Sequence, residues 1–238
     1  MLIVFEGVDS SGKETHSRKV YERLISEGHI ARKISFPNYE SRAAGAINMY
    51  LNGEFGKNPE DVNPFAASTF YAIDRFASFK QYWEAAITSG EIVIADRYTT
   101  SNMIHQGAKI KDDAERAEYV EWLCDLEFTR FKLPKPDKVI FLDMPMEFRM
   151  ELLKDRKEKD IHESDAEYMR TAHLCAQKMA KEQSWEQVSI VKNGKLRTIE
   201  DVHNEVYSIV LATMSQQRGC SNAVATLCNN VDSLETML

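Results

Sequence analysis

The sequence contains few of the residues that mark secreted, membrane-spanning or nucleic-acid-coating proteins. Its 238 residues include only four cysteines, widely spaced and without a C-x-x-C pair, so we expect reduced cytoplasmic thiols rather than disulfides or a zinc site. No apolar run approaches the roughly 18 residues of a membrane span, and the first residues lack a signal peptide's basic stretch. With 37 acidic and 30 basic residues, the net charge is −7, which argues against a protein that coats nucleic acid. We therefore expect neither membrane nor nucleic acid among its partners.

Short apolar runs alternate with longer helical patterns along the chain. The runs predict strands over residues 2–5, 30–36, 92–96, 139–143 and 188–192, and the patterns predict helices over 13–27, 41–52, 64–89, 112–131, 146–155, 166–183 and 199–214. Near-continuous apolar strands alternating with helices indicate parallel strands covered on both faces. We expect one α/β domain over residues 1–214, with a three-layer fold and about five parallel strands. Residues 215–238 are richer in Ser, Asn and Gln; they form either a frayed end or an extra helix, and weak order is favoured because undocked termini fray.

The segment from Gly7 to Lys13 fits the phosphate-loop pattern G-x-x-x-x-G-K. It follows a predicted buried strand and opens a predicted helix, which is the context that the motif needs. Its glycines let successive backbone N–H groups face one anion, and the lysine reaches the outer phosphates. A plain glycine turn between strand and helix is the alternative. The pattern predicts a P-loop NTPase fold, and the residues expected to bind ATP are Gly7, Ser10, Ser11, Gly12, Lys13, Glu14 and Thr15.

One position departs from the pattern. The residue after the lysine is normally Ser or Thr, whose hydroxyl holds Mg²⁺, but here it is Glu14, followed by Thr15. Three alternatives remain: Glu14 binds Mg²⁺ directly, it acts through water, or it turns away while Thr15 or a distant aspartate serves.

A second group of polar residues follows other predicted strands. Asp96 ends the strand 92–96 and Arg97 follows it directly, at the sheet edge where ligands bind in open parallel sheets. Asp96 could hold Mg²⁺, and Arg97 could clamp a phosphate. An ordinary strand-end ion pair is the alternative. The ion-pair alternative is less favoured when Arg42 and Arg75 are considered together with Arg97, because three arginines near strand ends suit the binding of one phosphomonoester.

Together these residues resemble the thymidylate kinase family, whose members phosphorylate dTMP with ATP. The likeness runs from Leu2 to about Met214. The matching elements appear in family order: Phe5 to Lys13, Phe36-Pro37 with Arg42, Phe70 to Phe76, Asp96-Arg97-Tyr98 with Ser101-Asn102, and the charged stretch from Arg156 to Glu163.

The resemblance implies a role for each of these positions. Asp9 would hydrogen-bond the deoxyribose 3′-hydroxyl and help to arrange the phosphates, and Asp96 would help to hold Mg²⁺. Arg42 and Arg97 would bind the acceptor phosphate. Tyr71 would stack on thymine, Arg75 and Asn102 would read the base edge or the monophosphate, and Gln106 would line the base pocket. Phe36 and Pro37 belong to the same substrate-binding set. Asp9, Lys13, Arg97 and Arg156 form the expected catalytic set.

The charged residues 154–165 match the family's lid, although most charge runs are simply solvated helix surfaces. Some relatives carry a catalytic arginine inside the phosphate loop, whereas this chain has Ser10 and Ser11 there. The positive charge should therefore come from the lid, first from Arg156. Such a charge accelerates phosphoryl transfer by about 10³–10⁵.

The resemblance also implies Mg²⁺ as cofactor, ATP and dTMP as substrates, a cytoplasmic location and a homodimer. Two alternatives to dTMP phosphorylation stay open. The first is a kinase for another nucleoside monophosphate, because the base pocket rests on Tyr71, Asn102 and few other residues. The second is a P-loop regulator with little turnover, which Glu14 favours.

Overall fold

The computed structural model describes residues 1–153 and 166–235, and a five-stranded parallel sheet lies at its centre. The spatial order is β2-β3-β1-β4-β5. The strands are β1 (Leu2–Glu6), β2 (Ala31–Ser35), β3 (Ile92–Asp96), β4 (Lys138–Asp143) and β5 (Glu186–Ser189), all joined in parallel register. A small antiparallel hairpin of β6 (Val191–Lys192) and β7 (Lys195–Leu196) follows. The predicted parallel sheet is confirmed.

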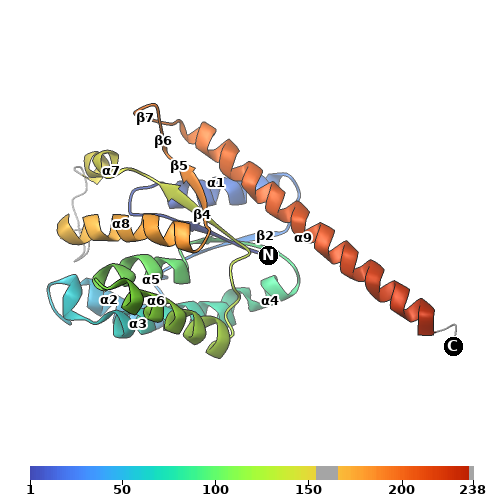
Figure 1. Cartoon of the computed structure of the whole chain (residues 1–238), viewed down its shortest axis with the longest axis horizontal. Coiled ribbons are helices and arrows are strands. Elements are labelled where there is room, and N and C mark those ends of the chain that lie inside the picture. Colours follow the sequence, from blue (N-terminus) through green and yellow to red (C-terminus); the bar gives the residue numbers. More distant parts are fainter. Residues whose placement is uncertain (154–165, 236–238) are drawn as a thin grey trace.

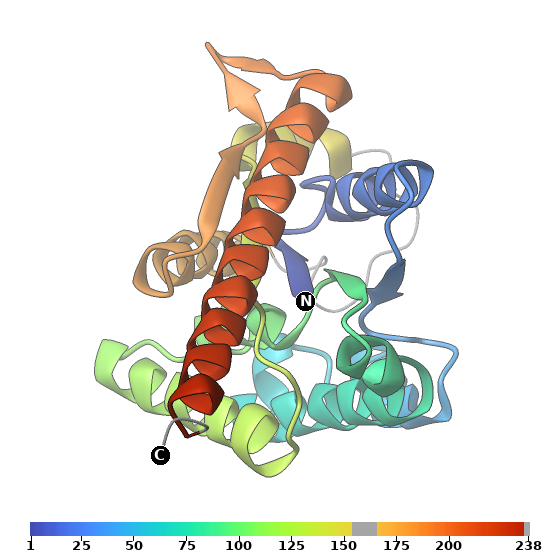
Figure 2. The ribbon, with the colours of Figure 1, turned by 90° about the vertical axis from the view of Figure 1, so that its right-hand side faces the viewer.

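Helices cover both faces of the sheet and complete three layers (Figure 1). One face is covered by α1 (Lys13–Ser26) and α9 (Ile199–Glu235), and the opposite face by α3 (Pro64–Ser78), α4 (Glu84–Thr88), α5 (Thr99–His105), α6 (Asp113–Cys124) and α8 (Ala166–Glu182). Helix α2 (Gly45–Leu51) packs against α3, and α7 (Met146–Leu153) follows β4 along the chain. Helix α9 crosses its face diagonally and continues past the edge of the sheet (Figure 2).

Strand alternation explains how the two cores form. In β1, Ile3 and Phe5 pack with α1 and α9, while Leu2 and Val4 pack against the helices of the opposite face. Side chains two positions apart share a face of a strand, so Glu6 continues the row of Leu2 and Val4. It is fully buried.

Several boundaries differ from the sequence prediction. The helix expected over 64–89 is divided by a π-helical turn at Phe79–Trp83, and the helix expected over 112–131 changes into π-helix at Asp125–Arg130. The last helix does not end at residue 214, because α9 runs to Glu235. Helix α5 was not predicted; its Thr-Thr-Ser-Asn start hides any apolar periodicity. The expected lid segment 154–165 lies outside the described residues.

Among the described helices, none combines the length and the apolar character that crossing a bilayer requires.

Candidate active site

The loop after β1 has the backbone shape of an anion-binding cradle. Gly7 has φ 151°, and a side chain there would meet the Ser11 hydroxyl at 2.6 Å and the Leu142 carbonyl oxygen at 2.7 Å. Gly12 has φ 88° and begins α1 without a side-chain cap. The first N–H groups of a helix have no partner within the helix. The uncapped start of α1 therefore presents donors and partial positive charge to a phosphate.

Lys13 is buried at the first position of α1. Its Nζ donates a hydrogen bond to the carbonyl oxygen of Val8, 2.8 Å away, so the lysine folds back over the loop. Burial, and then repulsion by Arg97, lower the pKa of Lys13 from its ordinary value to about 8. Among the described residues the buried Ser11 hydroxyl finds no hydrogen-bond partner. A polyanion in this loop would satisfy both groups.

A pocket opens beside this loop at the carboxyl edge of the sheet. It is lined by Asp9, Phe36, Pro37, Tyr39, Leu51, Tyr71, Arg75, Arg97, Tyr98, Ser101, Asn102, His105 and Gln106. Eight of the nine residues predicted to bind the acceptor therefore meet in one cavity. The ninth, Arg42, lies exposed in a short 3-10 turn, Arg42–Ala44, and is not among the lining residues. Arg156 lies outside the described residues.

Asp9 and Arg97 form an ion pair where the loop meets the pocket, and Nη2 of the buried Arg149 lies 3.4 Å from the second Asp9 oxygen. Burial alone would raise the pKa of Asp9, but the positive charges of Arg97 and Lys13 outweigh it and hold that pKa well below its usual range. For Arg97, burial alone would lower the pKa, but the negative charges of Asp9 and Glu6 outweigh burial, and the pKa is raised above its usual value. Both side chains are thus charged, and an incoming phosphate would compete with Asp9 for Arg97.

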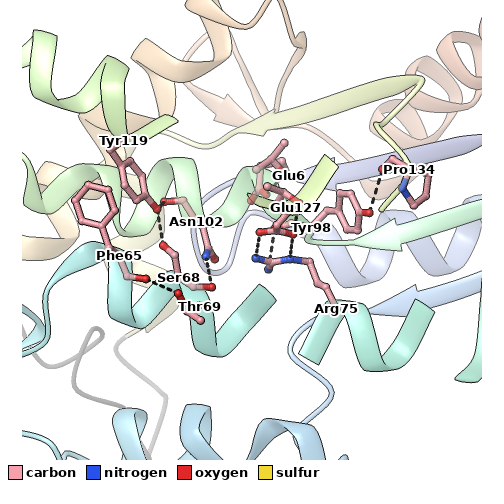
Figure 3. A network of polar contacts seen from close by, with 12 residues as sticks. Glu6, Phe65, Ser68, Thr69, Arg75, Tyr98, Asn102, Tyr119, Glu127 and Pro134 are labelled. Atoms are coloured by element: carbon pink, nitrogen blue, oxygen red, sulfur yellow. Dashed lines mark hydrogen bonds and ion pairs between the residues drawn. The ribbon is translucent and has the colours of Figure 1, made fainter. Parts of the chain in front are cut away.

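Arg75 lies in the pocket wall, paired with an acidic residue that the sequence did not single out (Figure 3). Its Nε and Nη2 donate to the two carboxylate oxygens of Glu127 at 2.7 and 2.6 Å, and both side chains are almost fully buried. Nη1 lies 3.5 Å from the Tyr98 carbonyl oxygen. Thr99 donates to the same carboxylate at 2.7 Å. Two of the three guanidinium nitrogens are therefore committed to the protein, which leaves Nη1 as the nitrogen least occupied by protein contacts.

The two residues predicted to bind metal lie in different surroundings. Asp96 is buried, and its Oδ1 has no hydrogen-bond partner within the described part of the chain. Glu14 is exposed on α1, where its Oε1 lies 3.3 Å from Nε of Arg18 and 3.7 Å from Nζ of Lys33. Of the three alternatives for Glu14, these ion pairs favour the one in which it turns away. No cluster of three or more metal-binding side chains occurs among the described residues.

Three further residues of this region escaped the sequence analysis. His105 lines the pocket, with Nε2 3.3 Å from Nη1 of Arg97; its spacing of three residues from Asn102 would have revealed it once a helix was assumed there. Glu6 is a charged residue in an otherwise apolar strand, which signals a buried carboxylate. Arg149 gave no signal, because nothing in its local sequence distinguishes it from a surface arginine of a helix.

Comparisons with known proteins agree with this geometry. The chain matches the family described as thymidylate kinase over residues 5–206. The thymidylate kinase of Mycobacterium tuberculosis is 31% identical over 175 residues, which cover 73% of this chain and 80% of that protein. The human thymidylate kinase is 30% identical over 145 residues, 61% of each chain. Among solved structures, the thymidylate kinase of Candida albicans superposes with a TM-score of 0.68 at 22% identity, covering 90% of this chain and 92% of that one, and so shares its fold. The chain belongs to the thymidylate kinase family.

Proposed function

We propose that this protein transfers the γ-phosphate of ATP to dTMP, giving dTDP for dTTP synthesis. One observation carries the proposal: a phosphate-binding loop and a separate pocket with aromatic, amide and arginine side chains meet at the Asp9–Arg97 pair. A donor and an acceptor phosphate bound in these two sites would lie next to each other. Membership of the thymidylate kinase family supports dTMP as the acceptor.

The donor site consists of the loop residues Gly7, Ser10, Ser11 and Gly12 with Lys13 and Thr15. The backbone N–H groups at the uncapped start of α1 hold the phosphates, and Lys13 releases the Val8 carbonyl to bind the outer oxygens. Phosphoryl transfer needs positioning and charge stabilisation rather than a covalent intermediate. The lysine and the helix start supply that stabilisation here.

The acceptor site is the pocket beside the loop. Tyr71 stacks on thymine, while Asn102, Gln106 and Nη1 of Arg75 face the base edge. Arg97 exchanges its contact with Asp9 for one with the acceptor phosphate, and the freed Asp9 carboxylate takes the 3′-hydroxyl. Phe36 and Pro37 close the pocket wall. Arg42 and the lid arginine Arg156 complete the positive charge around the transferred group.

Mg²⁺ is the cofactor that this chemistry implies. The unpartnered, buried Oδ1 of Asp96 fits a cation site at the end of β3. We propose Asp96 as the metal-holding carboxylate, with Glu14 remaining on the surface of α1. When bound, Mg²⁺ neutralises phosphate charge during the transfer.

We further propose a cytoplasmic homodimer. Phe65, Ile73 and Phe76 of α3 are 43%, 46% and 40% exposed, and their spacing places them within one stripe of the helix. Burying this stripe against a second copy would remove exposed apolar surface from water. Sedimentation of the purified chain tests it: Phe76→Glu should convert a dimer to a monomer.

The substrate assignment is tested by ADP release with ATP, Mg²⁺ and each of dTMP, dUMP, dGMP, dCMP and thymidine. Fast turnover with dTMP alone is expected. Preference for another monophosphate would overturn the base assignment and keep the fold and mechanism. Binding of ATP without turnover of any acceptor would indicate a regulator instead.

A further inference from the structure

Glu6 is an ionisable group in the centre of the fold to which the proposed phosphoryl transfer assigns no role. It is the last residue of β1, it is fully buried, and it is not among the lining residues of the pocket. A carboxylate is strongly disfavoured in a protein interior unless hydrogen bonds satisfy it. The partners of Glu6 therefore indicate why the chain tolerates a charge there.

These partners come from both halves of the site. Oε1 accepts a hydrogen bond from the backbone N–H of Gly7, 2.9 Å away, at the start of the phosphate loop. Oε2 accepts from the hydroxyls of Thr100 at 2.7 Å and Ser101 at 2.8 Å, in the first turn of α5. One side chain thus joins the loop that holds the donor to the helix that lines the acceptor pocket.

Helix α5 needs such an external support. It has only seven residues, and Tyr98 at its start provides no side-chain cap. Yet Ser101, Asn102 and His105, all within this helix, line the pocket. A displacement of about 1 Å between reacting groups can cost about 10²-fold in rate. Together with the hydrogen bond from Thr99 to Glu127, the contacts of Glu6 hold the first turn of α5 in place, and they alone among these contacts tie it to the phosphate loop.

We propose that Glu6 is a positioning residue that holds α5 in register with the phosphate loop and so sets the separation of the two substrates. The proposal rests on the kinase function proposed above. Glu6 touches neither substrate; it acts through Gly7 on the donor side and through Thr100 and Ser101 on the acceptor side. Its loss should therefore impair the alignment of two bound substrates more than the binding of either one.

The test separates turnover from binding in the full-length protein. Glu6→Gln keeps the shape of the side chain and removes its charge, and Thr100→Val with Ser101→Ala removes both hydroxyl donors. For each variant we expect kcat to fall by about tenfold or more, which corresponds to about 1.4 kcal/mol. The dissociation constants of dTMP alone and of ATP alone, measured by calorimetry, should change by less than about threefold. Combining all three substitutions should lower kcat little further, because they break the same link.

Two comparisons guard against a merely structural effect. Thr100→Ser, which keeps a hydroxyl, should have a higher kcat than Thr100→Val. Thr213→Val removes another buried hydroxyl that bonds only within α9 and should leave kcat unchanged. If Glu6→Gln fails to fold, the hydroxyl variants carry the test.

An unchanged kcat in folded variants, or losses of kcat that multiply in the combined variant, would overturn the proposal. So would substrate binding that weakens in proportion to kcat. If the wild-type chain prefers another nucleoside monophosphate, the assignment of dTMP fails, and the Glu6 test proceeds unchanged with that acceptor.

Discussion

The buried pair of Arg75 and Glu127 gives the sharpest prediction about stability. Glu127→Gln keeps the size of the side chain but leaves the Arg75 guanidinium charged and without its counterion. The pair is held by two short hydrogen bonds of 2.7 and 2.6 Å, and the side chains are 2% and 0% exposed. Because both side chains are almost fully buried, little solvent can replace the lost carboxylate, and most of the penalty of an uncompensated buried charge applies.

Breaking a buried ion pair by removing one partner costs about 3–5 kcal/mol. For a chain of this size, each kcal/mol lowers the melting temperature by about 2–4 °C, so we expect a decrease of about 6–20 °C. Urea unfolding followed by circular dichroism and calorimetric melting both measure the loss. The free energy of unfolding is typically about 5–15 kcal/mol, so the variant should be seriously weakened.

Two control variants make the result specific. Glu84→Ala breaks an exposed ion pair with Lys80; the side chain of Glu84 is 41% exposed and that of Lys80 is 49% exposed. This variant should lose about 0.5 kcal/mol of stability or less. The charge-free pair Arg75→Met with Glu127→Leu should regain most of the stability while losing affinity for dTMP. A loss below about 1 kcal/mol in Glu127→Gln would contradict this prediction, because the pair would then behave like a surface contact.

Three further predictions concern the reaction. Lys13 must keep its proton to hold phosphate, and its pKa is lowered to about 8, so kcat/KM for ATP should fall as the pH rises through about 8; Lys13→Arg should lack this decrease in a pH–rate profile. The effect of Lys13 on stability has the opposite direction. Because the unfolded lysine keeps its proton to higher pH than the folded one, this group should increase the free energy of unfolding as the pH rises above about 8. Arg97→Ala should raise the KM for dTMP about tenfold or more, through loss of charge-assisted hydrogen bonds, and leave ATP binding in calorimetry nearly intact; collapse of ATP affinity with dTMP affinity preserved would contradict its role. Glu14→Ser should keep the Mg²⁺ optimum of the activity assay, because Glu14 pairs with Arg18 and Lys33; a shifted optimum would make it a metal ligand.

Much of the architecture was predictable, since the apolar strands and the phosphate loop carry local signals. Leu2 to Phe5 is an apolar run before a glycine, which predicts a buried strand, and Gly7 and Gly12 bracket a loop that their positive φ angles make possible. Helix α5 was not predictable in this way. Its buried polar start is stabilised by Glu6 and Glu127, which lie far away in the sequence. Periodicity cannot reveal a helix held by such tertiary contacts.

The site was predicted largely by resemblance, and the structure adds the pairing of its charges. The gathering of Asp9, Tyr71 and Arg97 in one pocket follows the prediction. That Asp9 binds Arg97, and that Glu127 binds Arg75, could not be read from the sequence. Such contacts depend on the distance between strand ends and on side-chain orientation. The substrate-binding roles of these residues stay predictions until variants are assayed.

Transfer of the γ-phosphate from ATP to dTMP can be followed directly by ³¹P nuclear magnetic resonance of the purified protein mixed with ATP, Mg²⁺ and dTMP. If the protein phosphorylates dTMP, the two phosphorus signals of dTDP should grow as the dTMP signal falls, while ATP is converted to ADP in equal amount. Release of inorganic phosphate with dTMP unchanged, or no reaction in protein that binds both nucleotides, would contradict the proposed transfer.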